Sequence, residues 1–563
     1  MIGDADGRAE GIADLLRSRG YDAEVLSTDR GLPQGLTDIL HLAGLDASCS
    51  AQDMLKSAHA LVLKAASEAP AARITFLASG AIEAACLEGF GRGVAAELPE
   101  SLCRTITLDP GRSLDAQGSE LVAAITRGRG DIRIRETGPR SPHLVASPAP
   151  VADAPVFDPE ASYLVTGAYG GLGPHLVRWL HARGARRFVL AGRTPPGEEA
   201  RRLLDGIDAD FQVADVSDPE AVERLVARAC SIAPLKGVFH AAGALAEGAL
   251  VRQDAEGIVL PLGAKLDGAL ALDRATRDLP LDHFVLFSSA AGLLAPFGQA
   301  NHAAAATALD ALAHARRARG LPALCVDWGA FAEAGAAMRS GIEAKVSDTG
   351  LSFMGIEPAF EALGRAMGAG LTQVAILAAD WRQYRRRYPR GGVPFLLEEV
   401  CRFEDEAEIA STSAAQAPSS GSQRRQTKSE NRDWRGLLAS SPESHRFDRL
   451  CDAIRAEAAR ILHLPAAELD DLKPLREAGL DSLMSIEFRN VLSEACASRL
   501  GATIVFDHPS VRALATHLAD TAFDTLFAQK EEDAVSAADD LDGLDAEALA
   551  ALLASELGDD GRV

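Results

Sequence analysis

Aromatic residues are scarce in this sequence, and no long apolar run is present. Phe, Trp and Tyr make up 5% of the 563 residues, whereas hydrophobic residues as a whole reach 47%. This composition favours α/β and helical domains rich in small side chains over a disordered chain. No segment approaches the roughly 18 apolar residues of a membrane span, and the first residues lack the basic stretch of a secretion signal. We therefore expect neither a membrane partner nor a leader.

Cysteine is sparse, and basic residues are outnumbered. The eight cysteines form no C-x-x-C pair, which is typical of reduced, mostly buried thiols in a cytoplasmic protein and predicts no metal site. They are Cys49, Cys86, Cys103, Cys230, Cys325, Cys401, Cys451 and Cys496. Lys and Arg number 57 against 80 Asp and Glu, a net charge of −23. Because nucleic-acid binding needs a basic face, this balance argues against nucleic acid and favours partners with basic surfaces.

The length predicts about three or four domains. Residues 1–145 alternate helix-like and strand-like segments, with apolar runs at 23–26, 39–42 and 74–77. This βαβ rhythm predicts a parallel sheet. No glycine-rich fingerprint accompanies it, so we expect a Rossmann-like half without a cofactor. The chain also begins almost at once in a strand-like run, as a segment excised from a longer protein would.

A Pro- and Ala-rich connector, residues 141–159, leads to a second unit over 160–395. Its first strand, 162–165, is followed by a glycine-rich turn and an amphipathic helix. Strand, glycine turn and helix in one βαβ unit predict a dinucleotide site, because glycines let the backbone approach a pyrophosphate at a helix N-terminus. The residues expected to bind the cofactor in this turn are Thr166, Gly167, Gly171, Leu172 and Gly173.

The next strand, 188–190, is followed by Ala191, Gly192 and Arg193. An Arg here suits the 2′-phosphate of NADP, whereas Asp or Glu would suit NAD; a solvated Arg at a strand end is the alternative. Further strands are expected at 211–213, 237–240, 284–287 and 323–326. Asp215 and Val216 should lie near the adenine, and Ala242 and Gly243 should bring backbone close to the cofactor. Residues 330–356 could form a substrate lid.

The remaining chain changes character twice. Residues 404–444 are rich in Ser, Ala, Gln, Lys and Glu, which predicts a flexible linker without a core. Residues 445–522 predict a small helical bundle with helices at 454–462 and 511–518. Residues 530–563 form an acidic tail that ends in a short amphipathic helix signal.

One motif in the bundle is highly specific. Residues 479–490 read Gly-Leu-Asp-Ser-Leu-Met-Ser-Ile-Glu-Phe-Arg-Asn. A Ser that starts a helix is usually only an N-cap, but this motif resembles the acyl carrier protein of modular type I polyketide synthases. The resemblance implies that a phosphopantetheinyl transferase attaches a 4′-phosphopantetheine arm to Ser482. A helix N-terminus suits the phosphodiester.

Residues 1–390 resemble the ketoreductase of the same synthases, a structural subdomain followed by a catalytic one. The matching stretches are 166–173, 240–243, 265–269, 287–289 and 326–329. The resemblance implies an α/β fold of two Rossmann-like subdomains of the short-chain dehydrogenase type, followed by the helical carrier. It also implies a β-ketoacyl thioester as substrate and NADPH as hydride donor.

The family's catalytic set is only partly present. Ser289 matches its Ser and Lys265 its Lys, but the Tyr position holds His302 and the Asn position Ala306. An imidazole beside Lys265 should be neutral near pH 7 and a poor acid. Loss of a central donor costs about 10²–10³ in rate, so we expect a reductase that is silent.

Two alternatives stay open. In one, Ser289, Lys265 and His302 still support NADPH-dependent reduction. In the other, the whole chain is a scaffold and carrier whose reductase fold only positions Ser482. The residues alone are also compatible with His302 as a packing residue of an Ala-rich helix. The stereochemical type is equally open, because Leu245-Ala246-Glu247 replaces the Leu-Asp-Asp of one class and Leu294 replaces the Trp of the other.

The tail and the linker imply partners. The tail resembles the docking segments by which one synthase polypeptide recruits the next, and a solubilising acidic tail is the alternative. The linker would let the carrier bring acyl thioester intermediates to other synthase domains at high effective concentration.

Overall fold

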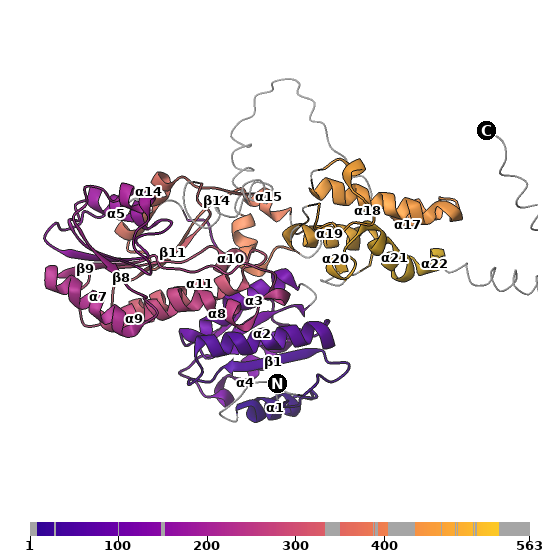
Figure 1. Ribbon diagram of the computed structural model, residues 1–563. Helices are drawn as coiled ribbons and strands as arrows, with labels where there is room; N and C mark the ends of the chain where they lie inside the picture. The colour runs from indigo at the N-terminus through magenta and orange to yellow at the C-terminus, as the bar shows by residue number, and fades with distance from the viewer. Residues whose placement is uncertain are drawn as a thin grey trace, which may run out of the picture. The chain divides into compact units, whose positions relative to one another are not determined.

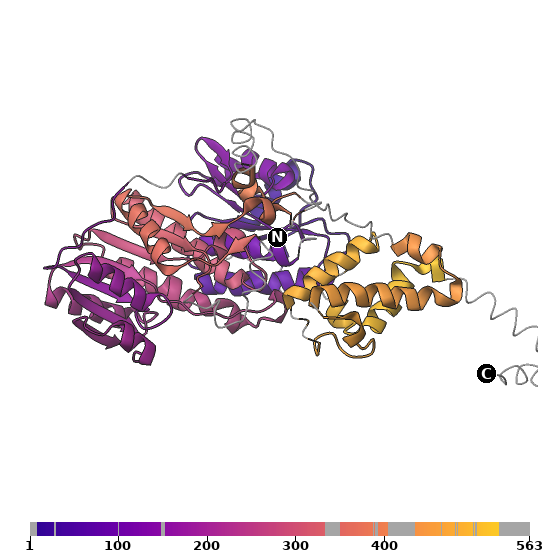
Figure 2. The same ribbon diagram turned by 90° about the horizontal axis from the view of Figure 1, so that it is seen from above.

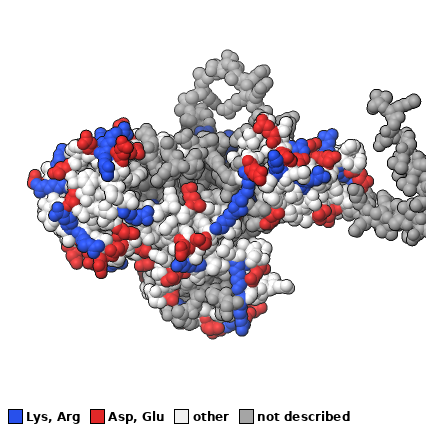
Figure 3. Space-filling model, in the orientation of Figure 1, with Lys and Arg blue, Asp and Glu red and all other residues white. Residues whose placement is uncertain are grey.

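The computed structural model divides the chain into two compact units, Met1–Ser419 and Ser420–Val563 (Figure 1). The residues described are 8–26, 30–98, 101–147, 152–332, 350–386, 388, 392–402, 434–462, 464–478, 480, 482–498, 500 and 504–527. Within these ranges, no helix has the length and apolar character needed to span a bilayer. On the face drawn in Figure 3, acidic and basic side chains are interspersed over the surface.

The first subdomain is built on a five-stranded sheet in the order β1-β2-β3-β4-β5, parallel except for the last pair. The strands are β1 Asp38–Gly44, β2 Arg73–Ala78, β3 Arg104–Thr107, β4 Ile132–Arg135 and β5 Gly138–Arg140. The helices are α1 Arg8–Ser18, α2 Ala51–Glu68, α3 Cys86–Glu97 and α4 Leu114–Arg127, with a 3₁₀ turn, η1, at Glu83–Ala85. The sheet and its covering helices have the Rossmann-like form expected.

The strand expected at residues 23–26 is absent. Ala23 and Val25 pack against the core of this subdomain, but the segment is not part of any strand in the described chain. An apolar run forms a strand only where a neighbouring strand takes up its backbone hydrogen bonds. The strand-like run at the very start of the chain falls in residues 1–7, outside the described ranges.

The second subdomain holds a seven-stranded parallel sheet in the order β13-β11-β10-β9-β6-β7-β8. The strands are β6 Ser162–Thr166, β7 Arg187–Gly192, β8 Ala209–Val213, β9 Leu235–His240, β10 His283–Phe287, β11 Leu324–Trp328 and β13 Gln373–Ile376. From β6 the chain runs outward to β8, then returns to β9 on the other side of β6. This reversal is the switch point at which doubly wound sheets bind ligands.

Helices cover both faces of this sheet (Figure 1). One face packs under α5 Gly173–Ala182 and α14 Ile356–Gly368; the other packs under α7 Pro219–Ile232, α9 Gly268–Ala275 and α11 Ala300–Ala318. Neighbouring strand residues alternate between the two cores, as the pleat requires: Leu164 joins one and Val165 the other. Strand β13 and helix α14 were not predicted from the sequence. Most of the lid expected over 330–356, residues 333–349, lies outside the described ranges.

Several short elements complete the first unit. They are α6 Glu198–Leu203, η3 Leu250–Arg252, α8 Ala255–Leu262, a π-helical turn η4 Gly263–Asp267, α10 Ala291–Leu294, β12 Leu351–Ser352, β14 Ala378–Ala379, α15 Trp381–Arg385 and η5 Phe395–Leu397. A π turn is rare and is often found at functional sites, and this one contains Lys265.

The second unit is helical (orange to yellow in Figure 2). Its elements are α17 Trp434–Ala439, η6 Glu443–His445, α18 Arg446–Leu462, η7 Ala466–Glu468, α19 Ser482–Ala495, α20 Ile504–Asp507, α21 Val511–Thr521 and α22 Asp524–Phe527. One apolar core, which includes Ile454, Phe488 and Leu514, joins α18, α19 and α21.

The linker expected over 404–444 is shorter at its carrier end. Trp434 and Leu438, four residues apart on one face of α17, are buried in the carrier core. The Arg435 guanidinium also donates to the Ala522 carbonyl at 2.8 Å. Residues 434–439 are therefore part of the bundle. Residues 403–433 and 528–563, with the rest of the linker and the acidic tail, lie outside the described ranges.

Candidate functional site

The glycine turn lies at the switch point, between the end of β6 and the start of α5. Gly167 has φ +71°, and a Cβ added there would lie 2.5 Å from the Ala241 carbonyl. Gly173 is in similarly close contact with the Gly167 carbonyl, so neither position admits a side chain. A Cβ on Gly170 would meet nothing within 4 Å. The N-cap residue of α5, Leu172, provides no side-chain cap, so the start of this helix suits an anion.

The end expected to hold the adenosine carries two charged residues. Arg193 and Asp215 are exposed just beyond β7 and β8. Hydrogen bonds from the Ser217 backbone and hydroxyl lower the pKa of Asp215, and the nearby Arg193 charge lowers it further. Val216 is buried against α9, where a Cβ on Gly268 would lie 3.0 Å from it. Val216 can therefore face a cofactor only through its backbone.

An aromatic side chain that sequence reasoning did not assign fixes the turn. The Tyr169 hydroxyl lies 2.5 Å from the Leu190 carbonyl oxygen and 2.9 Å from that of Gln212. Its ring stacks on Phe211, with centroids 6.1 Å apart, and fills the space above Gly192. Tyr169 thus holds the glycine turn onto β7 and β8.

His240, at the end of β9, was part of a matching stretch but had no assigned role. It is fully buried, with Nδ1 2.7 Å from Thr166 Oγ1 and Nε2 2.9 Å from the Lys265 carbonyl. Burial lowers its pKa to about 4, so the ring is neutral at pH 7. Nε2–H then donates to the carbonyl and Nδ1 accepts from the hydroxyl. His240 links two strand ends to the π turn that holds Lys265.

Lys265 itself is buried at the carboxyl edge of the sheet. Its stem passes Gly243, where an added Cβ would be 3.3 Å from Cε, and its Nζ donates to the Phe287 carbonyl at 3.2 Å. Phe287 ends β10, two residues before Ser289. Burial lowers the pKa of Lys265 to about 8, opposed by acidic groups nearby. Ala242 is half-buried beside Gly243, on the same loop.

Ser289 and His302 lie on the connection that follows β10, Ser289 two residues after the strand and His302 in α11. The Ser289 Oγ accepts a hydrogen bond from the Ala291 amide at 3.2 Å. His302 is half-buried in the first turn of α11, and its Nδ1 has no hydrogen-bond partner among the described residues. Burial, and then the charge of Lys265, lower the pKa of His302 to about 3. The lysine is therefore close to His302, and the imidazole is neutral at pH 7.

Ala306 is fully buried one turn after His302. Its carbonyl accepts from the Ser288 hydroxyl at 3.3 Å, and its methyl group is close to Gly292. This position offers no polar side chain to a proton relay.

A buried acidic cluster behind Lys265 was not expected. Ligand-type atoms of Asp310, Cys325 and Asp327 lie within 4.8 Å of one another, a spacing that could also hold a metal ion. Burial raises the pKa of both carboxyl groups and of the thiol. The thiol is therefore protonated at pH 7, and the carboxyl groups hold protons more tightly than usual. The cluster in turn opposes the fall in the pKa of Lys265 that burial causes.

In the second unit, Ser482 is the first residue of α19. Leu480 before it is 2% exposed, and Phe488 within α19 is fully buried. These apolar contacts fix the start of the helix, where a phosphate would meet backbone N–H groups. Gly479 and Asp481 of the motif fall outside the described residues.

Two family profiles match the chain: the KR domain over residues 161–333 and the phosphopantetheine attachment site over residues 452–518. The polyketide synthase GfsA of Streptomyces halstedii is 33% identical over 540 residues, which cover 93% of this chain and 7% of that protein. The solved structure of the first ketoreductase of the tylosin synthase is 30% identical, with a TM-score of 0.61, over 72% of this chain and 94% of that one. A C2-type ketoreductase from a modular synthase, 25% identical, has a TM-score of 0.64 over 71% of this chain and 95% of its own.

The fold, the glycine turn and the helical unit together define a ketoreductase of the short-chain dehydrogenase type joined to a phosphopantetheine carrier domain. The chain belongs to the modular type I polyketide synthases and corresponds to a ketoreductase and acyl carrier protein region. It spans 7% and 9% of the lengths of the relatives GfsA and GfsB.

Proposed function

We propose that this part of a synthase carries an acyl intermediate on Ser482, while its ketoreductase domain binds NADPH but does not reduce the β-keto group. The observation that carries the proposal is the half-buried imidazole of His302, neutral at pH 7, in the first turn of α11 at the position where the family has a Tyr. The remaining parts of the site are compatible with a cofactor.

The residues fit NADPH in their chemistry. The uncapped start of α5 and the open side of Gly170 suit the pyrophosphate, and exposed Arg193 suits the 2′-phosphate. Bound NADPH would supply a hydride. Ser289 would donate a hydrogen bond to the substrate carbonyl, and the backbone at Ala242 and Gly243 would border the cofactor.

The missing step is protonation. A reduced carbonyl becomes an alkoxide and must take a proton from a donor of suitable pKa. At pH 7 the ring of His302 holds only its one neutral N–H, which can donate a hydrogen bond but is far too weak an acid to release a proton. Lys265 donates to the Phe287 carbonyl, and Ala306 has no group to relay a proton.

The test is NADPH oxidation with a soluble β-ketoacyl thioester, run beside an NADPH titration by fluorescence. We expect binding without turnover. Rapid formation of a β-hydroxy product by the unaltered protein would refute the proposal. Absence of both binding and turnover would instead favour a scaffold in which the reductase fold only accompanies the carrier.

The carrier assignment has its own test. Incubation with coenzyme A and a phosphopantetheinyl transferase should add the mass of one phosphopantetheine, and Ser482→Ala should stay unshifted. Ser485, buried on the same helix, is the matched control, and Ser485→Ala should still be modified. A mass shift that survives Ser482→Ala would place the arm elsewhere.

Partners follow from the carrier role. We propose that the loaded arm presents acyl thioesters to other synthase domains and that the acidic tail recruits a downstream synthase subunit. A pull-down that compares the full chain with one ending at residue 527 tests the tail; equal capture of the next subunit would exclude it.

A further inference from the structure

The two subdomains of the first unit meet backbone to backbone. Helix α3 of the first subdomain crosses α11 of the second, the helix that carries His302. A Cβ on Gly93 would lie 2.5 Å from the Ala300 side chain, and one on Gly89 would overlap the Ala303 carbonyl. The start of α11 therefore rests directly on α3.

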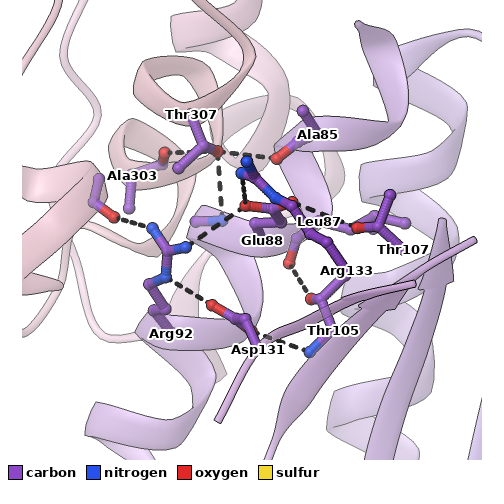
Figure 4. A network of polar contacts seen from close by, with 12 residues as sticks. Ala85, Leu87, Glu88, Arg92, Thr105, Thr107, Asp131, Arg133, Ala303 and Thr307 are labelled. Carbon is purple, nitrogen blue, oxygen red and sulfur yellow. Dashed lines mark hydrogen bonds and ion pairs between the residues drawn. The ribbon is translucent and has the colours of Figure 1, made fainter. Parts of the chain in front are cut away.

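Polar side chains of the first subdomain continue this contact (Figure 4). Glu88 lies between two arginines, 3.4 Å from Arg92 and 2.7 Å from Arg133. Arg92 also donates to the Gly292 carbonyl at 2.6 Å, three residues after Ser289. The Thr307 hydroxyl of α11 donates to the Ala85 carbonyl at 2.8 Å.

Glu97, the last residue of α3, contacts two backbone segments of the second subdomain. It is 4% exposed, and its two carboxylate oxygens accept from the Leu250 amide at 2.7 Å and the Gly298 amide at 3.0 Å. Burial raises the pKa of Glu97 to about 7, and the two N–H donors oppose this rise. One carboxylate thus bridges two separate backbone segments.

These segments also bind each other. The Gly248 amide donates to the Gly298 carbonyl at 3.0 Å, and Asn301 Nδ2 donates to the Ala246 carbonyl at 2.8 Å. Gly298 lies four residues before His302. Residues 246–250, which we call the clamp loop, are therefore fixed against the start of α11 at the point where both meet Glu97.

Helix α2 of the first subdomain supports the same region. His59 Nε2 lies 2.9 Å from the Leu250 carbonyl. Gln52 Nε2 donates to Asp267 at 2.8 Å, two residues after Lys265. Segments that carry Lys265, Ser289 and His302 are each bonded to a side chain of the first subdomain.

We propose that Glu97 is a positioning residue whose carboxylate holds the clamp loop against the start of α11 and so sets the place of His302 in the reductase-like site. The inference concerns the same site as the proposed function, but its test requires no turnover. Failure of one can therefore be told apart from failure of the other.

The test is Glu97→Gln in the full chain at a pH above 8, where Glu97, with its pKa of about 7, is ionised. An amide oxygen can accept from one of the two N–H groups, but the amide NH₂ opposes the other with a second donor. We expect hydrogen exchange in peptides covering 246–250 and 296–302 to rise about tenfold. Carbethoxylation of His302 by diethyl pyrocarbonate, read by mass spectrometry, should rise by a similar factor.

Internal controls separate positioning from general destabilisation. Buried His240 should stay unreactive, and exchange in β6 and β10 should not change. Glu361→Gln removes a carboxylate that pairs with Arg183 at the surface and should leave both readouts at wild-type levels. Unchanged exchange and His302 reactivity in Glu97→Gln, or equal increases at His240 and in the central strands, would overturn the proposal.

Discussion

The protonation state of His302 follows from its surroundings. The side chain is half-buried in an Ala-rich helix, and burial, with the charge of Lys265, moves its pKa to about 3. Its Nδ1, which has no partner in the described part of the chain, is more easily tolerated as an acceptor than as a buried donor, which favours the tautomer with the proton on Nε2. A phenol at this position would remain protonated at pH 7 and could still act as an acid.

Restoring the family's two polar groups should restore reduction. We expect His302→Tyr with Ala306→Asn to raise the rate of NADPH oxidation on a β-ketoacyl thioester by about 10² or more. His302→Phe with Ala306→Asn is the matched control without a hydroxyl, and it should stay at the wild-type rate. If the Tyr variant binds NADPH yet gains nothing, the defect lies elsewhere in the site.

His302 should also make the fold sensitive to acid. Its pKa is about 3 in the folded protein against about 6.5 for a solvent-exposed imidazole, so below pH 6.5 the unfolded chain binds the extra proton. The stability that the neutral imidazole of His302 contributes to the fold is present above pH 6.5 and is lost as the pH falls toward 3. The difference in unfolding free energy between His302→Gln and wild type should therefore shift in favour of the variant by about 1–2 kcal/mol from pH 7 to pH 5.

Urea unfolding of both proteins at the two pH values measures this difference. Buried His41 and His240 titrate in the same window, so only the comparison between variant and wild type isolates His302. A difference between variant and wild type that stays constant from pH 7 to pH 5 would mean that folding does not lower the pKa of His302.

At the scale of elements, sequence patterns succeeded where local signals agreed. The strand at 162–165, the glycine turn and the helix after it were predictable because apolar run, glycines and helical period occur in order. The strand predicted from the apolar run at 23–26 was wrong, because strand formation depends on pairing with a neighbouring strand, which a local sequence pattern does not reveal. Strand β13 was missed because its four residues are only half-buried and carry a weak apolar signal.

Helix α17 was not predicted, because the residues before it have the composition of a flexible linker. Leu438 is fully buried in the carrier core, whereas adjacent Leu437 is 40% exposed. Leu438→Ala should destabilise the carrier unit by about 2–5 kcal/mol, the cost of a core cavity, and Leu437→Ala by less than about 1 kcal/mol.

Denaturant unfolding of a carrier segment that retains α17 measures both changes, and the pair differs in burial but not in chemistry. Equal effects of the two substitutions would show that α17 does not pack as described.

At the scale of the molecule, the candidate site could be predicted only in part. Lys265 and Ser289 were assigned through the resemblance of stretches 265–269 and 287–289, and Arg193 through its place after a strand; their roles stay predictions. Glu97 carries no such signal, because its partners are backbone amides 153 and 201 residues away in the chain. His240 and the acidic cluster became visible only when folding brought β6, β9 and β11 to one edge.

The division into two units predicts two unfolding transitions. Saturating NADPH should raise the thermal unfolding midpoint of the ketoreductase unit alone. The rise should correspond to about 2.7 kcal/mol of unfolding free energy at a hundredfold excess of NADPH over its Kd. Calorimetry with and without NADPH measures this, and Arg193→Glu should weaken the shift. A ligand-dependent shift in the carrier transition would mean that the units unfold together.

The buried Trp434 bears on how such proteins are cut and recombined. The carrier profile begins at residue 452, yet the core already holds side chains from 434 onward. A chimeric synthase spliced at the profile boundary would lose four side chains of this core, those of Trp434, Leu438, Leu450 and Cys451, and would expose the apolar surface that they cover. The safer junction lies upstream of residue 434, where a donor carrier keeps its whole interior.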